Sequence, residues 1–512
     1  MSLSKKLSNS SLPWFSIGIA TIFCFSLVLH FWGLGRFNDL IFDEVYYAKF
    51  SNNYLIGKQF FNAHPPLSQY IIAIGMWLGS HLPFGQDTVN GLTGSLRSTW
   101  SYRWFNAITG SFIPLVVAAV AYQLNHRRSY ALIAALFAAA DGLFLVESRY
   151  ALNNVYLVIL GLLGQLFFLL ALNQKAGKRW LMLILSGVFL GASATIKWNG
   201  LWFLLGIYLL WGTAWVLRSL RTRVASASQP GNPYASTRPQ LSKPLLIPSP
   251  EEQRQRQLPS SRHSNPLANL TQIKLFHIVV SFAIIPFLTY RLLWIPHLIM
   301  NPTPGFWEAQ VKILSFHENI TSGTDVHPYC SKWYTWPWMW RPVAYFYDTA
   351  LNTSEPVPLN PPLPRGMGQV VYDVHAMGNP CLWWLSTAAI ILLLLVLVQR
   401  LLEGVGWKMP LTPYTGIALY LFLNWLANLL PWVRVSRCTF LYHYMGASVF
   451  SGLALAWLVD CWLSSKLPQH KSAGATVIVM VLLAFVFWLP IYLGLPLSPE
   501  TYQLRMWFRS WI

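Results

Sequence analysis

Apolar stretches of about 20 residues recur along the chain and alternate with short polar or charged segments. An α-helix of roughly 20 apolar residues is long enough to cross the hydrocarbon core of a membrane. Eleven such stretches occur, at 12–34, 105–124, 130–146, 155–172, 180–196, 199–217, 275–297, 381–399, 411–433, 439–463 and 473–495. The pattern therefore predicts an all-α polytopic membrane protein with about eleven transmembrane helices.

The first apolar stretch is interpreted as a retained span. It follows Lys5 and Lys6, runs without a charge from Leu7 to Gly35, and lacks a small-residue cleavage site. It is also longer than the apolar region of a typical secretory signal.

Basic residues predict which helix ends face the cytoplasm. The N-terminus and alternate connections (127–128, 175–179, 218–274, 400–408 and 466–471) hold 20 of the 36 Lys and Arg residues but three of the 17 Asp and Glu residues. Because cytoplasmic loops of membrane proteins are enriched in Lys and Arg, these connections are expected inside. An odd number of spans then places the C-terminus outside.

The connections divide the chain into four parts. We expect a catalytic bundle at 1–217, a disordered cytoplasmic linker rich in Ser, Pro, Gln and Arg at 218–274, a seventh span with an external loop at 275–380, and a four-helix portion at 381–512. The external segment 35–104 contains apolar turns too short to span, such as Tyr70 to Leu78. These predict helices that lie along the membrane interface.

Composition agrees with this class of protein. Hydrophobic residues make up 54% and charged residues 10% of the 512 positions, against roughly 25% charged in an average soluble domain. The net charge of +19 is spread over the connections rather than gathered on one face, so we do not expect nucleic acid as a partner. The five cysteines show no CxxC spacing and indicate no metal knot or disulfide framework, although one bridge between Cys330 and Cys381 stays open.

Candidate chemistry lies at the expected outer ends of the helices. Two adjacent carboxylates, Asp43 and Glu44, follow the first span on a chain with few acidic residues. Ionisable residues at a membrane edge are costly and often functional. Others gather there in the predicted topology: Arg36, Arg103, Asp141, Glu147, Arg149, Lys197, Arg434 and Arg437. The alternative is an exposed loop pair at Asp43 and Glu44, with arginine and lysine side chains that reach toward the interface at Arg149 and Lys197.

Sugar transfer from a lipid-linked phosphate requires these groups together. Arginine or lysine must hold the phosphate leaving group, because both make charge-assisted hydrogen bonds to its oxygens. A carboxylate must accept the proton of the acceptor hydroxyl. The lipid tail stays in the membrane, which explains a site at helix ends and the lack of a nucleotide-binding Gly-rich loop.

Several short motifs occur in an order that resembles the protein O-mannosyltransferase family, in its bacterial-type form. They are Phe42-Asp43-Glu44, His64-Pro65-Pro66-Leu67, Tyr102-Arg103-Trp104-Phe105-Asn106, Glu147-Ser148-Arg149-Tyr150, His327-Pro328-Tyr329, Gly378-Asn379-Pro380 with Trp383-Trp384, and Arg437 before Phe440-Leu441-Tyr442-His443-Tyr444. The resemblance implies a type C glycosyltransferase fold. It also implies transfer of mannose from a dolichyl-type polyprenyl phosphate to Ser or Thr of exported proteins, by an inverting mechanism.

The resemblance also implies roles for individual residues. Asp43 matches the catalytic acid-base position, and Glu44 matches its partner. Arg36 and Arg103 match arginines that serve the donor phosphate and the integrity of the site. We further predict donor-phosphate or substrate contacts at His64, Arg149, Arg437 and His443, with Arg434 as an alternative to Arg437.

Two features depart from parts of the family. Residues 298–380 leave no room for the β-trefoil module that eukaryotic members insert after span seven. Asn153-Asn154 stand where relatives often carry an acidic residue after the Ser-Arg element, so a divalent cation is left open and no cofactor is required. The expected location is the bacterial cytoplasmic membrane with the site facing outward, or the endoplasmic reticulum membrane in a eukaryote.

The expected partners are a polyprenyl-phosphate-mannose donor, secreted or membrane protein acceptors met at the translocon, and membrane lipids. Three other functions compete with this prediction. A related type C transferase that moves aminoarabinose or another sugar to a lipid or glycan needs the same residue types. A transporter is expected to show two related halves, which the sequence lacks. A non-catalytic scaffold does not account for the clustered external charges.

Overall fold

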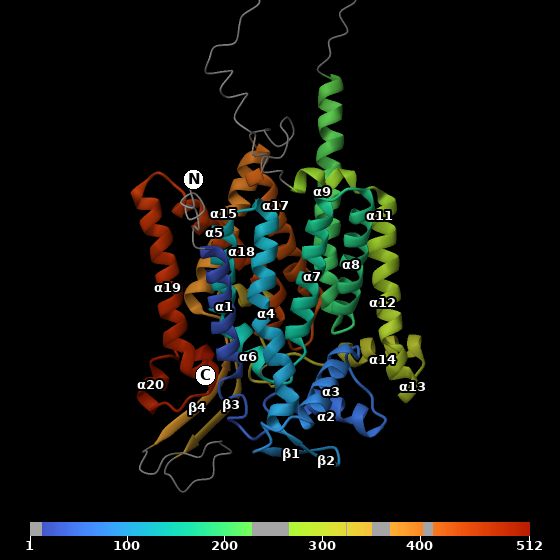
Figure 1. Cartoon of the computed structure of the whole chain (residues 1–512), viewed down its shortest axis with the longest axis vertical. Coiled ribbons are helices and arrows are strands. Elements are labelled where there is room, and N and C mark those ends of the chain that lie inside the picture. Colours follow the sequence, from blue (N-terminus) through green and yellow to red (C-terminus); the bar gives the residue numbers. More distant parts are fainter. Residues whose placement is uncertain (1–12, 228–265, 324, 351–368, 403–412) are drawn as a thin grey trace, which may run out of the picture.

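Long helices run side by side to form a bundle, and short helices and two hairpins cover one end of it, drawn at the bottom of Figure 1. The computed structural model describes residues 13–227, 266–323, 325–350, 369–402 and 413–512. Helix α1 begins at the upper end of the bundle in Figure 1 and the chain ends at the lower end.

Within the described residues, nine helices or helix runs are long and apolar enough to cross a membrane. They are α1 (Trp14–Phe31), α4 (Thr99–Asn125), α7 (Asn154–Leu172), α9 (Leu201–Ala227), the run α11 (Leu275–Val279), α12 (Ile285–Leu293) and α13 (Ile295–Met300), α15 (Pro380–Leu402), α17 (Pro413–Leu429), α18 (Met445–Leu463) and α19 (Pro468–Leu493). A tenth span is formed if α5 (Arg128–Ala139) and α6 (Gly142–Arg149), which meet at 58°, count as one.

The expected number of eleven spans is therefore higher than the structure supports by length and hydropathy. The remaining predicted stretch, 180–196, forms α8 (Ala176–Ala194), which packs along α7 and α12. Its first turns carry Lys178 and Arg179, and its second half is rich in Gly, Ala and Ser, so it is less apolar than the other ten. The small residues allow α8 to pack closely on its neighbours. At Gly187 there is no room for a side chain, because a Cβ there would lie 2.1 Å from the backbone oxygen of Ser281.

Short helices lie at the lower end of the bundle, and two of them fall in the segment 35–104, where interfacial helices are predicted. They are α2 (Glu44–Ile56), α3 (Leu67–Ser80), α14 (Phe306–Glu318) and α20 (Pro499–Gln503). Helix α14 buries Phe306 and Ile313 against the protein and exposes Trp307 and Val311. This two-sided pattern is typical of a helix that lies in the membrane interface.

The described chain is mostly helical, as predicted, and two short hairpins at the same end are the exception. Strands β1 (Val89–Leu92) and β2 (Ser95–Ser98) pair antiparallel across Thr93 and Gly94, which both have positive φ. That is the turn chemistry of a two-residue hairpin. Strands β3 (Val343–Ala350) and β4 (Val370–Ala376) pair antiparallel, with Val343 opposite Ala376.

Buried apolar residues form one main continuous cluster that extends from α1 to the C-terminal 3₁₀ turn. The expected linker is shorter than 218–274, because α9 continues to Ala227 and a 3₁₀ helix covers Pro266–Gln272. The rest of that segment, 228–265, lies outside the described residues.

Candidate active site

Asp43 precedes α2 and lines a cavity of about 400 Å³ at the covered end of the bundle. The residue before it, Phe42, has a φ of 51°, a left-handed conformation that bulky side chains rarely adopt. Its ring stacks on Tyr345 with centroids 4.2 Å apart and an interplanar angle of 8°. Such a backbone conformation costs on the order of 1–3 kcal/mol and persists where the surroundings enforce it. Packing on Phe42 therefore holds the turn that presents Asp43.

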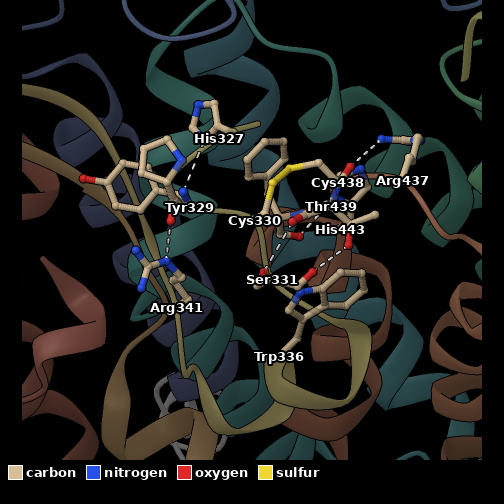
Figure 2. Close-up of a disulfide and its surroundings, with 12 residues drawn as sticks. His327, Tyr329, Cys330, Ser331, Trp336, Arg341, Arg437, Cys438, Thr439 and His443 are labelled. Carbon is tan, nitrogen blue, oxygen red and sulfur yellow. Dashed lines mark hydrogen bonds between the residues drawn. A yellow bond between two sulfur atoms is a disulfide. The ribbon is translucent and has the colours of Figure 1, made fainter. Parts of the chain in front are cut away.

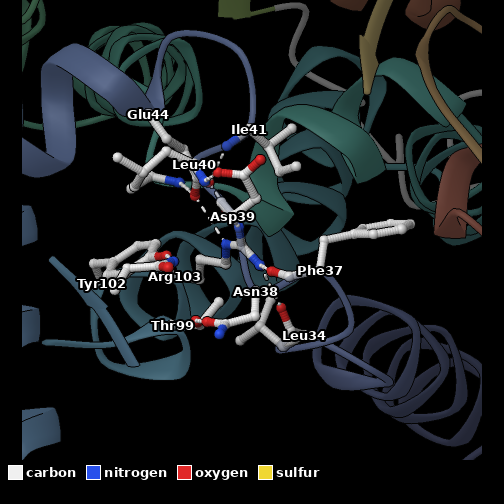
Figure 3. Close-up of polar contacts among 12 residues, drawn as sticks. Leu34, Phe37, Asn38, Asp39, Leu40, Ile41, Glu44, Thr99, Tyr102 and Arg103 are labelled. Carbon is white, nitrogen blue, oxygen red and sulfur yellow. Dashed lines mark hydrogen bonds and ion pairs between the residues drawn. The ribbon is translucent and has the colours of Figure 1, made fainter. Parts of the chain in front are cut away.

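Glu44 is turned away from the cavity and forms a buried ion pair with Arg103 (Figure 3). Both side chains are 0% exposed. Arg103 Nε donates to Glu44 Oε1 at 2.9 Å and Nη2 donates to Oε2 at 2.7 Å, which is a bidentate, charge-assisted pair. The backbone N–H groups of Ile41 and Ala151 also donate to this carboxylate, each at 2.8 Å. Glu44 therefore fixes the loop and does not face a substrate.

Two buried guanidinium groups organise the segment that leads to Asp43. Arg103 donates to the backbone carbonyls of Leu34, Phe37 and Asp39 (Figure 3). Arg149 donates to those of Leu29, His30 and Gly33. These carbonyls lie outside regular ladders or at a helix end, where an unpaired buried acceptor is costly. The phosphate contacts expected for Arg103 and Arg149 stay predictions; in this structure each guanidinium is enclosed and donates hydrogen bonds to backbone carbonyls.

The cavity around Asp43 continues into a second one of about 280 Å³. We name them the carboxylate lobe, which contains Asp43, Tyr47 and Tyr442, and the cationic lobe, which contains Arg434, Trp432 and Trp202. Five residues line both lobes: His64, Lys197, His317, Arg437 and His443. A ligand that spans both lobes would meet the Asp43 carboxylate at one end and, at the other, three cationic side chains with the exposed Glu318 beside them.

Lys197 reaches the cavity from the end of α8 through a chain of buried polar side chains. Its Nζ donates to Asn154 Oδ1 at 3.1 Å, and Asn154 Nδ2 donates to Glu147 Oε2 at 3.0 Å. The hydroxyl of Tyr345 donates to the other oxygen of Glu147. Lys197 Nζ also lies 5.4 Å from the ring centroid of Tyr442. The lysine is therefore held in place inside the protein, with its charge next to Asp43.

The environment shifts the protonation equilibria of the external groups that face the carboxylate lobe. Burial raises the pKa of the Asp43 carboxyl to about 6, although the charge of Lys197 opposes this shift. Burial and the charge of Lys197 lower the pKa of His64 well below its usual value, and burial lowers that of His317 to about 4. At neutral pH Asp43 is therefore mostly a carboxylate, and both histidines are neutral.

A disulfide joins the loop after α14 to the segment that carries Arg437 (Figure 2). It pairs Cys330 with Cys438, so the bridge between Cys330 and Cys381 that the sequence left open is corrected: Cys381 is unpaired. Backbone contacts run beside the bridge, because Ser331 N donates to the Thr439 carbonyl at 2.8 Å. Arg437 Nη1 donates to the carbonyl of Cys438 at 3.0 Å. The bridge thus anchors the backbone next to a cationic residue of the site.

The structure brings together part of the predicted set. Asp43, His64, Arg437 and His443 line the joined lobes. The other predicted residues, Arg36, Glu44, Arg103 and Arg149, do not line them. The substrate contact expected for Arg36 stays a prediction; the residue lies half-buried in the loop before Asp43, near Gly33 and Tyr372.

Sequence reasoning underrated Lys197 and missed His317 and Trp432. The sequence favours an interfacial lysine at position 197. However, Lys197 stands directly after a predicted span, on the same side as Asp43, and this position also indicates a place in the site. His317 lies on α14, before the motif His327-Pro328-Tyr329 but outside it, and no pattern pointed to it.

A metal site is not evident in the part of the chain that the structure describes. No three His, Cys, Asp or Glu side chains gather closely enough there to hold an ion. Of the two asparagines after the Ser-Arg element, Asn154 joins the buried network, since it makes hydrogen bonds with both Glu147 and Lys197.

Two family models match separate halves of the chain. The model described as dolichyl-phosphate-mannose-protein mannosyltransferase matches residues 20–234. The model described as the C-terminal four TMM region of protein-O-mannosyltransferase matches residues 302–511.

Curated relatives share low identity over most of the chain. The polyprenol-phosphate-mannose--protein mannosyltransferase of Corynebacterium glutamicum is 23% identical, over 88% of this chain and 81% of its own length. The protein of the same name from Mycolicibacterium smegmatis is 24% identical, over 96% and 92%.

Solved structures show the same arrangement of helices. The S. cerevisiae protein O-mannosyltransferase Pmt1-Pmt2 complex bound to the sugar donor aligns over 98% of this chain and 93% of that chain, with a TM-score of 0.72 and 14% identity. An Archaeoglobus fulgidus oligosaccharyltransferase aligns over 94% and 53%, with a TM-score of 0.50 and 13% identity.

Proposed function

Because this chain belongs to the protein O-mannosyltransferase family and has the type C glycosyltransferase fold, we propose that it transfers mannose from a polyprenyl phosphate to Ser or Thr hydroxyls of exported proteins. One observation carries the proposal beyond the family likeness. The buried carboxylate of Asp43 shares joined cavities with Lys197, Arg434 and Arg437 at one end of the membrane bundle, and the exposed Glu318 lies at the margin of the cationic lobe.

The donor phosphate occupies the cationic lobe. Arg437 and Lys197 line both lobes and Arg434 lines the cationic lobe, so a phosphate there meets three positive charges. Trp432 adds an indole N–H. The side chain is buried, at 4% exposed, yet this N–H has no acceptor among the described residues. The lobe lies at the ends of membrane helices, and the polyprenyl tail extends from it into lipid.

Asp43 is the general base. Its pKa of about 6 is close to neutral pH, which favours a base that must both be ionised and accept a proton. The acceptor hydroxyl gives its proton to the Asp43 carboxylate while its oxygen forms a bond to C1 of mannose. The bond between C1 and the phosphate oxygen breaks, and its electron pair leaves with the polyprenyl phosphate. The Asp43 carboxyl then releases its proton to water.

The displacement takes place in one step and inverts the configuration at C1. A double displacement needs a second carboxylate as nucleophile close to the first. Glu44 is engaged with Arg103, and Glu147 is bonded to Asn154 and Tyr345. Glu318 is exposed and lines the cationic lobe but not the carboxylate lobe, so Asp43 acts as the base, and a β-linked donor yields an α-linked product.

The remaining predicted residues position Asp43 or line the cavity. Glu44, Arg103 and Arg149 hold the loop that ends in Asp43 through the bonds described above. His64 and His443 line both lobes, where neutral imidazoles suit hydrogen bonds to sugar hydroxyls.

The site faces the outer side of the membrane. The disulfide between Cys330 and Cys438 lies beside the site, and disulfides persist in oxidising compartments. The basic connections at 127–128, 175–179 and 466–471 lie at the other end of the bundle, in agreement with the positive-inside bias. In a bacterium this side is the outer face of the cytoplasmic membrane, where acceptors emerge from the translocon among membrane lipids.

A labelled-donor assay tests the function. Purified protein in vesicles is given radiolabelled polyprenyl-phosphate-mannose and a Thr-containing peptide. We expect label in the peptide, and a loss of about 10²- to 10⁴-fold in rate for Asp43→Asn. Asp39→Asn is the matched control, because the exposed Asp39 carboxylate bonds only to the neighbouring backbone N–H of Leu40, at 2.7 Å. Label in lipid or glycan instead of peptide would support the related transferase.

A further inference from the structure

A third cavity adjoins the carboxylate lobe, and we propose that it binds the backbone of the acceptor polypeptide beside the modified Ser or Thr. We name it the side pocket: it lies between the α2–α3 connection (57–66) and α13–α14 and has a volume of about 250 Å³. Phe61 and Asn62 line both the side pocket and the carboxylate lobe. This inference rests on the proposed function and names how that same site recognises its protein substrate.

Asn62 is a buried, oriented donor at the junction of the two cavities. The residue is 4% exposed. Its Oδ1 accepts a hydrogen bond from the backbone N–H of His64 at 3.2 Å, which fixes the orientation of the carboxamide. Its Nδ2 has no acceptor among the described residues. Since an unpaired buried donor is costly, a ligand that supplies an oxygen acceptor here would be favoured.

Trp294 supplies a second donor to the side pocket. It is 2% exposed, and its Nε1 also has no acceptor within the described part of the chain. The nearby Tyr290 hydroxyl does not meet hydrogen-bond geometry with it. That hydroxyl instead accepts from Trp198 Nε1 at 3.0 Å and donates to Gln310 at 2.6 Å. Both unpaired buried groups that line the side pocket are therefore N–H donors.

The wall of the side pocket is preformed. Gln59 Nε2 donates to the Met300 carbonyl at 3.1 Å, and Phe60 N donates to Asn301 Oδ1 at 2.8 Å. The one cation in the lining, Lys312, lies with its Nζ 4.6 Å from the ring centroid of Phe61. A preformed wall reduces the ordering cost of binding.

Uncharged oxygen acceptors that enter from the carboxylate lobe fit this pocket best. An extended polypeptide presents a backbone carbonyl at every residue, so a chain whose Ser or Thr lies at Asp43 carries acceptors toward Asn62 and Trp294. The donor phosphate instead belongs in the cationic lobe, which neither of these two residues lines. The side pocket therefore recognises the main chain and not a particular side chain.

Two substitutions remove one donor each with little change of shape. Trp294→Phe deletes the indole N–H, and Asn62→Asp deletes the amide donor while keeping the oxygen that His64 N–H contacts. The acceptor is a synthetic peptide with a single threonine between alanines. Loss of one hydrogen bond predicts a KM for this peptide raised roughly three- to tenfold, with an unchanged KM for polyprenyl-phosphate-mannose.

Matched tryptophan variants separate this effect from a general weakening. Trp432→Phe removes the unpaired donor of the cationic lobe and should raise the KM for the lipid donor instead. Trp180 lies in the first turns of α8 and lines none of the three cavities, so Trp180→Phe should change neither the peptide KM nor the donor KM. A short acceptor, N-acetylthreonine methylamide, has too little main chain to reach the side pocket, so its KM should not rise in Trp294→Phe.

Three outcomes would overturn the inference: an unchanged peptide KM in both variants, an equal rise for peptide and short acceptor, or a rise in the donor KM. Absence of mannose transfer by the unaltered protein would refute the proposed function instead. In that case fluorescence anisotropy of the labelled peptide still decides the inference, which requires weaker binding to Trp294→Phe than to Trp180→Phe.

Discussion

Asp43 differs from its neighbour Glu44 in what surrounds it, and this difference gives the two carboxylates separate tasks. Glu44 accepts four hydrogen bonds from the protein and is enclosed. Asp43 faces the cavity, and none of the described residues donates a hydrogen bond to its side chain. A carboxylate that is already satisfied is a poor base, whereas one that is desolvated and unpaired is available to a substrate hydroxyl.

The pH dependence of the reaction should follow Asp43. A base works when it is deprotonated, and the pKa of Asp43 is raised to about 6. Activity should therefore be full above this pH and fall about tenfold per pH unit below it, measured as kcat/KM between about pH 5 and pH 8. A profile that stays flat down to about pH 4, the usual range of an exposed carboxyl, would contradict this assignment.

Substitution of Arg103 should lower stability, whereas substitution of Arg437 should lower donor affinity. Removal of one partner of a buried ion pair typically costs about 3–5 kcal/mol, so Arg103→Ala should lower the thermal unfolding temperature and the amount of folded protein. Glu44→Gln should do the same to a smaller extent, because the amide keeps an acceptor for Arg103. Thermal unfolding in detergent, followed by tryptophan fluorescence, measures both.

Arg437→Ala should instead weaken donor binding. Loss of a charge-assisted hydrogen bond of about 1.5–3 kcal/mol predicts a Kd for polyprenyl-phosphate-mannose raised roughly 10- to 100-fold, with little change in unfolding temperature. Reversed results, with donor affinity lost in folded Arg103→Ala and retained in Arg437→Ala, would return Arg103 to the phosphate site.

At the scale of elements, the site depends on loops that distant residues hold in place. The segment 33–44 is tied to α4 and α6 by Arg103 and Arg149. The segment 435–440 is tied to the loop after α14 by the disulfide and its flanking backbone bonds (Figure 2). Each tie joins parts of the chain far apart in sequence, which places donor and base groups on one cavity.

Opening the disulfide should impair the donor side of the site. Cys330→Ser is expected to raise the KM for the lipid donor more than it changes kcat, because Arg437 precedes Cys438 directly. Loss of the bridge should also lower stability by about 2–4 kcal/mol. Steady-state kinetics and thermal unfolding check this, with Cys24→Ser as control, since Cys24 is exposed and unpaired. An unchanged donor KM would show that the bridge only stabilises the fold.

For the whole molecule, the orientation in the membrane decides which substrates the cavity meets. With the three unpaired cysteines replaced, Gln59→Cys should react with an impermeant thiol reagent only from outside, and Ser465→Cys only from the cytoplasm. Labelling intact cells and inverted vesicles measures this. Reaction of Gln59→Cys from the cytoplasmic side alone would reverse the orientation and with it the proposed function.

The sequence by itself determined the membrane character, the positions of the long helices and the importance of the Asp43 region. These follow from local properties, because roughly 20 apolar residues must bury their backbone polar groups in helices wherever they cross lipid. Motifs with charged residues at helix ends can also be recognised from the sequence alone. The family resemblance through Asp43, His64 and Arg437 rested on such motifs, and the family comparisons agree with it.

Only the tertiary structure decided which charges line the cavity and which are enclosed within the fold. Arg103, Arg149 and Arg437 all stand at helix ends in the sequence, yet two are enclosed by backbone carbonyls and one lines the cavity. The partner of Cys330 and the place of His317 depended likewise on contacts across more than a hundred residues. The role of an ionisable side chain is set by its desolvation and partners, which are properties of the packed molecule rather than of the local sequence.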